Sequence, residues 1–183
     1  MGRIEVRLTG FGGQGIVLAG IILARAAMYD GKEVAQNQSF GPEARGGACQ
    51  SGVVICDEPI LYPFADELDI LVAMSQEALD KHINSLKKGG KLILDSDMIS
   101  RIPKKSGVEI NKVTATSIAV DKLGKGILAN IIMLGALSSL TNIVSKEAVK
   151  KAVKESVPEG TEEINLQALA EGFSEFQEKV ARK

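Results

Sequence analysis

Aromatic residues are scarce in this sequence, which contains five Phe, two Tyr and no Trp in 183 residues. A core built from it must therefore be mainly aliphatic. The composition, 45% hydrophobic and 25% charged, is otherwise typical of a globular protein and excludes a disordered or fibrous chain. The length suits one full-sized domain, to which we assign residues 1–183.

An excess of charge of either sign is also absent, because 22 Lys and Arg residues are balanced by 23 Asp and Glu residues. Without a broad basic field, the chain is not expected to bind nucleic acid. The N-terminal stretch MGRIEVRLTG alternates charged and apolar residues, unlike a secretory signal. The longest apolar run, GILANIIMLGALSSL, is interrupted by Asn130 and is too short to span a bilayer. We therefore expect a cytoplasmic protein that binds no membrane.

Histidine and cysteine are nearly absent. The single histidine, His82, falls on a predicted helix among Lys and Asp residues, so we predict a solvated surface position and exclude a His-based catalytic triad. Cys49 and Cys56 are spaced for neither a zinc site nor iron–sulfur ligation, and they imply no disulfide framework. We predict no catalytic residue and no metal ligand in this chain.

Hydrophobic patterning predicts strands that alternate with helices early in the chain. The predicted strands are 3–8, 33–38, 49–56, 67–75, 91–95 and 108–114. The predicted helices are 16–29, 76–86, 116–123, 127–140, 146–156 and 165–180, with a glycine turn, KKGG, before the strand at Lys91. This order predicts an α/β fold, a three-layer sandwich with a mixed, partly parallel sheet flanked by helices. The sheet is expected to be mixed because a loop precedes the strand 49–56. The last helix is expected to be peripheral.

The motif GFGGQG lies between the first predicted strand and the first predicted helix. It satisfies G-x-G-x-x-G at Gly10, Gly12 and Gly15, and this context favours an anion-binding loop at a helix N-terminus. The alternative is that the glycines serve only the close packing of helix on sheet. A dinucleotide site would require an acidic residue at the end of the second strand, but that strand ends in VAQNQ. A nucleotide-hydrolysing P-loop is excluded because G-x-x-x-x-G-K-[ST] is missing.

Two further features leave alternatives open. In the loop SFGPEARGGA, Arg45 could reach a phosphate or carboxylate, or it could form only a surface pair with Glu43. The predicted helix 127–140 is apolar nearly all the way round, so it is either fully buried or covered by another subunit. Its one large polar residue, Asn130, is favoured as a satisfied core amide over a ligand contact.

Several motifs together resemble a known family. The segments GFGGQGIVLAGIILARA, QNQSFGPEARGGACQSGVVI, DILVAMSQEAL, GGKLILDS and LANIIMLGAL occur in that order. They resemble the gamma subunit of the 2-oxoacid:ferredoxin oxidoreductases, most of all the 2-oxoglutarate type, from Arg3 to about Leu140. The last forty residues are similar only in being helical. The sequence does not exclude the indolepyruvate-specific or the branched-chain type of this subunit.

The resemblance implies a multisubunit enzyme that decarboxylates a 2-oxoacid on thiamine diphosphate. Electrons then pass through iron–sulfur clusters to ferredoxin, and the acyl group passes to coenzyme A. It also implies that alpha and beta subunits hold thiamine diphosphate and Mg²⁺, and that the clusters lie in a ferredoxin-like subunit or in beta. This chain would then be a partner in the reaction without its catalytic centre.

The resemblance further implies that this chain contributes to the coenzyme A site. We carry that role over to Gly10, Gly12, Gly13, Gln14 and Gly15, and also to Arg45, Gly46 and Gly47. The sequence departs from the family at Gln50, where a basic residue is common, and at Gly52, where an acidic residue is common, so Gln50 is not included. Two alternatives are a stand-alone NAD-type nucleotide-binding module and a purely structural subunit.

Overall fold

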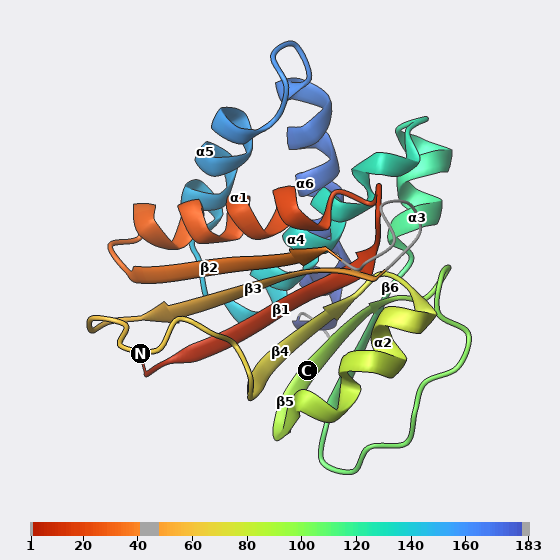
Figure 1. Ribbon diagram of the computed structural model, residues 1–183. Coiled ribbons are helices and arrows are strands. Elements are labelled where there is room, and N and C mark those ends of the chain that lie inside the picture. Colours follow the sequence, from red (N-terminus) through yellow and green to blue (C-terminus); the bar gives the residue numbers. More distant parts are fainter. Residues whose placement is uncertain (1, 41–47, 181–183) are drawn as a thin grey trace.

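The computed structural model describes residues 2–40 and 48–180, and it forms one six-stranded sheet with helices on both faces (Figure 1). The strands are β1 (Ile4–Phe11), β2 (Glu33–Phe40), β3 (Ala48–Cys56), β4 (Leu68–Ala73), β5 (Leu86–Asp95) and β6 (Glu109–Val113). The helices are α1 (Ile16–Tyr29), α2 (Gln76–His82), α3 (Ala115–Ser117), α4 (Ala129–Thr141), α5 (Lys146–Ser156) and α6 (Glu162–Val180).

The strand order in the sheet is β2-β3-β1-β4-β5-β6. β1, β4, β5 and β6 are parallel to one another, whereas β3 is antiparallel to both β1 and β2. Five strands therefore run in one direction and β3 runs against them. Only residues 41–47 separate β2 from β3, too few for the crossover that a parallel pair needs. The predicted mixed sheet is confirmed.

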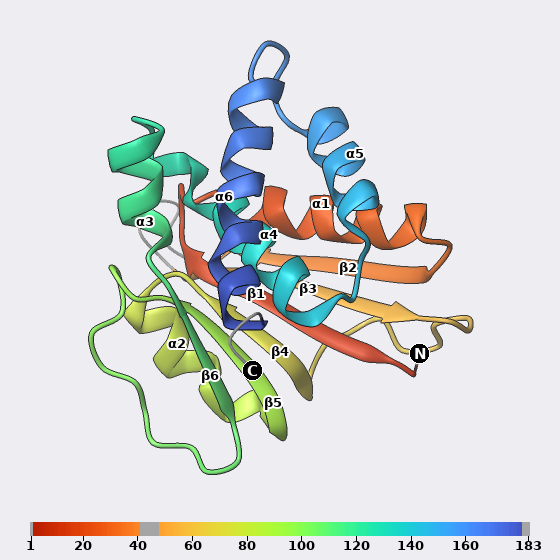
Figure 2. The same cartoon turned by 180° about the vertical axis from the view of Figure 1, so that it is seen from behind.

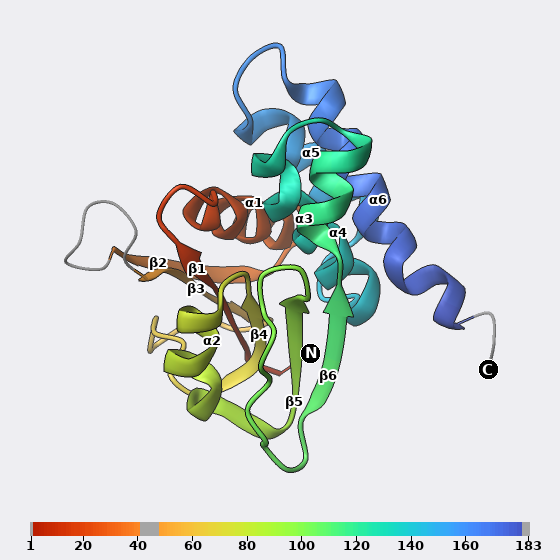
Figure 3. The same cartoon turned by 90° about the vertical axis from the view of Figure 1, so that its right-hand side faces the viewer.

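Helices form a layer on each face of the sheet. α1, α4, α5 and α6 lie on one face and α2 lies on the other (Figure 3). On the first face α1 packs over β2 and β3, α5 packs on α1, and α6 packs on α4. On the second face, Val54, Leu71, Leu79 and Leu92 belong to a separate aliphatic cluster between α2 and the sheet. The predicted three-layer α/β arrangement is confirmed.

The last helix is an integral part of the core, so the expectation that it is peripheral was wrong. Figure 2 shows α6 lying across α4. The two helices cross so closely that a Cβ on Gly135 would collide with the backbone oxygen of Leu169, and one on Gly172 with that of Ile132. Phe173 buries its ring in the same cluster. As a result α4 is covered by its own chain. Of the two alternatives for helix 127–140, burial within this chain is therefore correct, and another subunit is not needed to cover it.

Two other predictions were wrong around the end of α2. The predicted helix 76–86 ends at His82, a 3₁₀ turn spans Ile83–Ser85, and β5 already begins at Leu86. The KKGG segment therefore lies within β5 and is not a turn before it. The pairing with β4 shifts from Leu68–Leu86 to Ile70–Lys91, so the extra residues form a bulge in β5. Gly89, at φ 84°, supplies the backbone conformation this bulge requires.

The expectation that His82 is a solvated surface residue was also wrong. The residue is 6% exposed, and it lies on the same face of α2 as the buried residues Ala78 and Leu79. That face packs against β1, where Arg7 lies 3.3 Å from the imidazole Nδ1. The Lys and Asp neighbours that suggested a surface position occupy the opposite, solvated side of a short helix.

Candidate functional site at the glycine turn

The glycine turn connects the carboxyl end of β1 to the N-terminus of α1. Gly13, at φ 99°, and Gly15, at φ 72°, adopt the left-handed conformation that favours glycine, and Gly15 is the residue that caps α1. α1 and α2 leave the ends of β1 and β4 toward opposite faces of the sheet. The turn therefore lies at the topological switch point, where open α/β sheets form a crevice.

Two of the five glycine-turn candidates serve packing. A Cβ on Gly10 would collide with the amide oxygen of Gln14 and lie 2.9 Å from the Cδ1 of Ile16. A Cβ on Gly15 would collide with the amide of Asn130, whose Nδ2 donates a hydrogen bond of 3.1 Å to the Gly15 oxygen. The packing alternative therefore explains Gly10 and Gly15. Asn130 is 3% exposed, so the expected satisfied core amide is confirmed.

Gln14 fixes the shape of the turn from inside. Its Oε1 accepts a hydrogen bond of 2.8 Å from the backbone N–H of Phe11, and its Nε2 donates one of 2.8 Å to the oxygen of Met74. Met74 directly follows β4. The side chain thus ties the turn after β1 to the end of the neighbouring parallel strand. Its amide is engaged in these contacts, so Gln14 is a positioning residue in this structure.

Gly12 and Gly13 are exposed, and a Cβ on Gly13 would meet no atom within 4 Å. Beside them, the N-terminus of α1 has no side-chain cap and no acidic residue in its first turn. The starts of α2 and α5 differ, because Ser75 and Ser145 cap them and each first turn contains a glutamate. An uncapped helix start with its partial positive charge is free to accept an anion from outside the chain.

A crevice of about 270 Å³ opens beside the turn. It is lined by Phe11, Gly13, Gln14, Met74, Met98, Thr116, Gly126, Ile127 and Ala129. These residues come from the ends of β1, β4 and β5 and from the start of the helical half of the chain. The walls are mainly apolar, with the glycine turn as the polar opening. The arrangement suits a ligand that combines an anionic group with an apolar part.

The sequence interpretation missed the residues contributed by the later segments. Asp95, the last residue of β5, is fully buried and accepts a hydrogen bond of 2.6 Å from the hydroxyl of Thr116 on the crevice wall. Burial raises the pKa of the Asp95 carboxyl above its ordinary value. Asp95 could have been identified as a site candidate from the sequence, because it is the last residue of a predicted parallel strand.

Three predicted site residues, Arg45, Gly46 and Gly47, lie outside the described residues. Across residues 2–40 and 48–180, no three His, Cys, Asp or Glu side chains come together to hold a metal ion. No helix in those same ranges is long and apolar enough to cross a membrane.

The fold and the turn define a class: an α/β domain with a glycine-rich turn at the switch point of a mostly parallel sheet. The chain belongs to the pyruvate ferredoxin/flavodoxin oxidoreductase family, whose model matches residues 5–175. Within it, the chain is a gamma-type subunit of a 2-oxoacid:ferredoxin oxidoreductase. The resemblance drawn from the sequence motifs is confirmed.

Individual relatives show the same relationship. The chain is 54% identical to the 2-oxoglutarate synthase subunit KorC of Methanocaldococcus jannaschii, over 93% of this chain and 92% of the relative. The structure is similar to the keto/oxoacid ferredoxin oxidoreductase gamma subunit of Geobacter sulfurreducens PCA, with a TM-score of 0.87, 44% identity and coverage of 96% and 97%. It is also similar to the 2-oxoglutarate:ferredoxin oxidoreductase of Magnetococcus marinus, solved with 2-oxoglutarate, coenzyme A and succinyl-CoA bound. That similarity has a TM-score of 0.85 and 25% identity, and it covers 96% of this chain and 31% of the other.

Proposed function

We propose that this chain is the gamma subunit of an enzyme that oxidises 2-oxoglutarate to succinyl-CoA and passes the electrons to ferredoxin. Its partners would be alpha and beta subunits, which bind thiamine diphosphate and Mg²⁺, and a ferredoxin-like subunit or domain with the iron–sulfur clusters. The similarity to KorC over almost the whole of both chains supports the choice of 2-oxoglutarate. A cytoplasmic location and a single domain over residues 1–183 stay predictions.

We further infer that the glycine turn contributes to coenzyme A binding. The observation that carries this inference is the uncapped start of α1 beside the open glycines at the mouth of the crevice. Coenzyme A has a pyrophosphate, which such a helix start can bind through backbone N–H groups, and apolar portions that suit the crevice walls. Gly12 and Gly13 would hold the phosphate because no side chain keeps it from the backbone.

A matched pair of substitutions tests the coenzyme A role. Gly13 and Gly31 lie before and after α1, both at positive φ, and a Cβ at either would meet no atom within 4 Å. Gly13→Leu and Gly31→Leu therefore introduce the same side chain, in each case at a glycine with positive φ. We expect Gly13→Leu to raise the apparent KM for coenzyme A at least tenfold in the assembled enzyme, and Gly31→Leu to leave it unchanged. An equal KM in all three enzymes would rule out the role of the turn.

The substrate is tested on the complex purified anaerobically through a tag on this chain. We expect thiamine-binding and iron–sulfur subunits to co-purify and to reduce a viologen dye with 2-oxoglutarate and coenzyme A. Pyruvate, branched-chain 2-oxoacids and indolepyruvate serve as competing substrates. Faster dye reduction with one of these would reassign the substrate while leaving the subunit role intact.

A further inference from the structure

A second region of the molecule presents exposed apolar side chains. The connection from β3 to β4, residues 57–67, which we call the strap, carries Leu61, Tyr62 and Phe64 with 96%, 53% and 50% of each residue exposed. Two of the seven aromatic residues of the chain are therefore among them. Single exposed apolar residues are common on protein surfaces, but three within four positions form a patch that needs an explanation.

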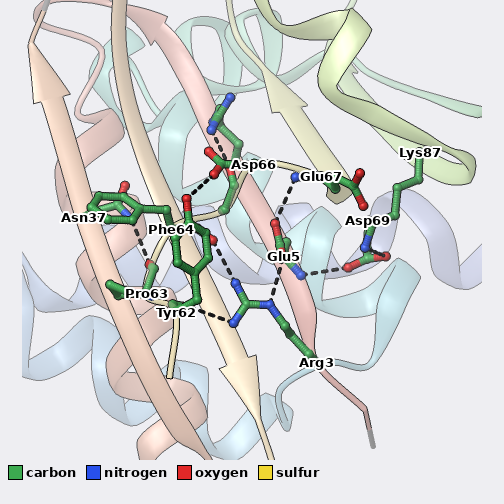
Figure 4. A network of polar contacts seen from close by, with 12 residues as sticks. Arg3, Glu5, Asn37, Tyr62, Pro63, Phe64, Asp66, Glu67, Asp69 and Lys87 are labelled. Carbon is green, nitrogen blue, oxygen red and sulfur yellow. Dashed lines mark hydrogen bonds and ion pairs between the residues drawn. The ribbon is translucent and has the colours of Figure 1, made fainter. Parts of the chain in front are cut away.

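The strap is held in place by the sheet beneath it. Four successive carbonyl oxygens, those of residues 62–65, each accept a hydrogen bond from a side chain of β1, of β2 or of Arg3, which directly precedes β1 (Figure 4). Arg3 donates to Tyr62 over 2.7 Å and to Phe64 over 2.8 Å. Asn37 donates to Pro63 over 3.0 Å, and Arg7 donates to Ala65.

The remaining contacts also fix the orientation of the strap. The Glu5 carboxylate accepts from the Glu67 N–H over 3.0 Å, and it pairs with Arg3 over 2.8 Å. The Tyr62 hydroxyl donates to Asp66 over 2.6 Å. A Cβ on Gly52 of β3 would lie 2.8 Å from Asn37 Oδ1 and 3.4 Å from the Cβ of Ala65. The lack of a side chain at Gly52 lets the strap lie directly on the sheet.

This anchoring determines where the apolar side chains point. Because the strap uses its backbone and Ala65 to bind the sheet, Leu61, Tyr62 and Phe64 are directed outward. The rings of Tyr62 and Phe64 are 5.5 Å apart and inclined by 60°, so they pack on each other at the surface. A rigid apolar surface of this kind loses little conformational entropy on binding. Aromatic side chains such as those of Tyr62 and Phe64 are enriched at the centres of protein interfaces.

The strap also lies where the fold leaves a sheet face thinly covered. Mostly parallel sheets are normally covered by helices on both faces. Among the described residues, α2 covers the second face over β1 and β4, while next to β2 and β3 the covering segment is the strap. In the Magnetococcus marinus relative, a domain like this one accounts for 31% of a much longer chain, so it has further protein attached to it.

We propose that the strap is the docking anchor for another subunit of the oxidoreductase, the one that corresponds to the remainder of that longer relative. Glu58, Asp66 and Glu67 are exposed around the apolar side chains. The partner surface is therefore an apolar groove with Lys and Arg residues at its rim, which would match both the patch and its acidic border. This inference concerns assembly and is separate from coenzyme A binding.

The test compares Leu61→Glu with Met28→Glu in the co-expressed complex. Both replace an exposed apolar side chain with the same charge, and Met28, on α1, is 62% exposed. Leu61 is almost fully exposed, so its replacement leaves the fold of the free chain intact, which thermal unfolding checks. We expect Leu61→Glu to weaken binding to the partner subunits at least tenfold in titrations, and Met28→Glu to bind as the wild type does. In the wild type, the backbone amides of Ile60, Leu61, Tyr62 and Phe64 should exchange more slowly in the complex than in the free chain.

Other outcomes would overturn the proposal. Wild-type affinity of Leu61→Glu for the partners, or unchanged amide exchange, would show that the partner does not cover the strap. Loss of a dimer of this chain without loss of assembly would assign the patch to a second copy. The docking role of the strap and the coenzyme A role of the glycine turn are tested independently. Enzyme assembled with Leu61→Glu should keep its KM for coenzyme A, and Gly13→Leu should assemble normally.

Discussion

The imidazole of His82 has a chemically unusual environment. Arg7 donates to its Nδ1 over 3.3 Å, and its buried Nε2 has no hydrogen-bond partner among the described residues. Burial, together with the positive charges of Arg7 and Lys81, lowers the pKa of His82 to about 4. The ring is therefore neutral in the folded protein near pH 7, and protonating it would place a second cation beside Arg7.

This pKa predicts how stability changes with pH. In the unfolded chain His82 titrates near 6.5, so between pH 6.5 and about 4 the unfolded state binds more protons than the folded state. The contribution of His82 to stability is complete above pH 6.5 and is lost as the pH falls toward 4. The loss is at most about 3 kcal/mol in the free energy of unfolding.

Urea unfolding of the wild type and of His82→Asn, measured at intervals from pH 7.5 to 4, isolates this contribution. The Asn side chain keeps an oxygen that can accept from Arg7 but has no proton to gain. We expect the wild type to lose stability relative to the variant as the pH falls, with the difference changing mainly below pH 6.5. Parallel curves for the two proteins would contradict the lowered pKa of His82.

At the scale of elements, the contact between α4 and α6 depends on two glycines. A Cβ on Gly172 would collide with the Ile132 oxygen and lie 2.9 Å from its carbonyl carbon and 3.0 Å from the Ala136 nitrogen. These are backbone atoms of α4, which cannot move away as a flexible side chain would. Elsewhere in a helix, Gly→Ala would be stabilising by roughly 1 kcal/mol.

We expect Gly172→Ala to reverse this sign and to destabilise the fold by about 1–3 kcal/mol, because the two helices must separate. The measurement is the urea midpoint of the isolated chain, with Ser174→Ala as the control. Ser174 is exposed on the same helix and its hydroxyl donates to the Ala170 oxygen over 3.1 Å, within its own helix, so its replacement should shift the midpoint little. A more stable Gly172→Ala protein would show that α6 does not pack as described.

At the scale of the whole molecule, strand order argues against an NAD-type module. In a dinucleotide fold the second strand lies beside the first, and an acid at its end reaches the ribose. Here β3 is inserted between β1 and β2, so the end of β2 lies two strand spacings, about 10 Å, from β1. The missing acid after VAQNQ and the strand order therefore both argue against a dinucleotide site.

We accordingly predict that calorimetric titration of the isolated chain with NAD or NADP detects no binding at micromolar concentrations. The same titration with coenzyme A, in the free chain and in the complex, shows how much of that site this chain forms alone. Micromolar affinity for either dinucleotide would revive the nucleotide-binding alternative.

The sequence by itself determined the class of fold, the glycine turn and the family. These depend on local signals: strand and helix periodicity, a glycine motif between a strand and a helix, and ordered segments that each match the family. The sequence also correctly predicted Asn130 as a core amide, because a lone polar residue in an apolar helix must be satisfied within the core.

Tertiary structure alone decided which residues share a surface. The burial of His82 depends on which face of α2 meets β1, and the role of α6 depends on Gly135 and Gly172 approaching a distant backbone. The division of the glycine turn into packing residues and open ones required the positions of Asn130 and Gln14. The strap is held on the sheet by contacts such as those of Arg3, Arg7 and Asn37, which span 26 to 61 positions in the sequence. Such long-range contacts leave no periodic trace in a single sequence, which is why only the folded chain reveals them.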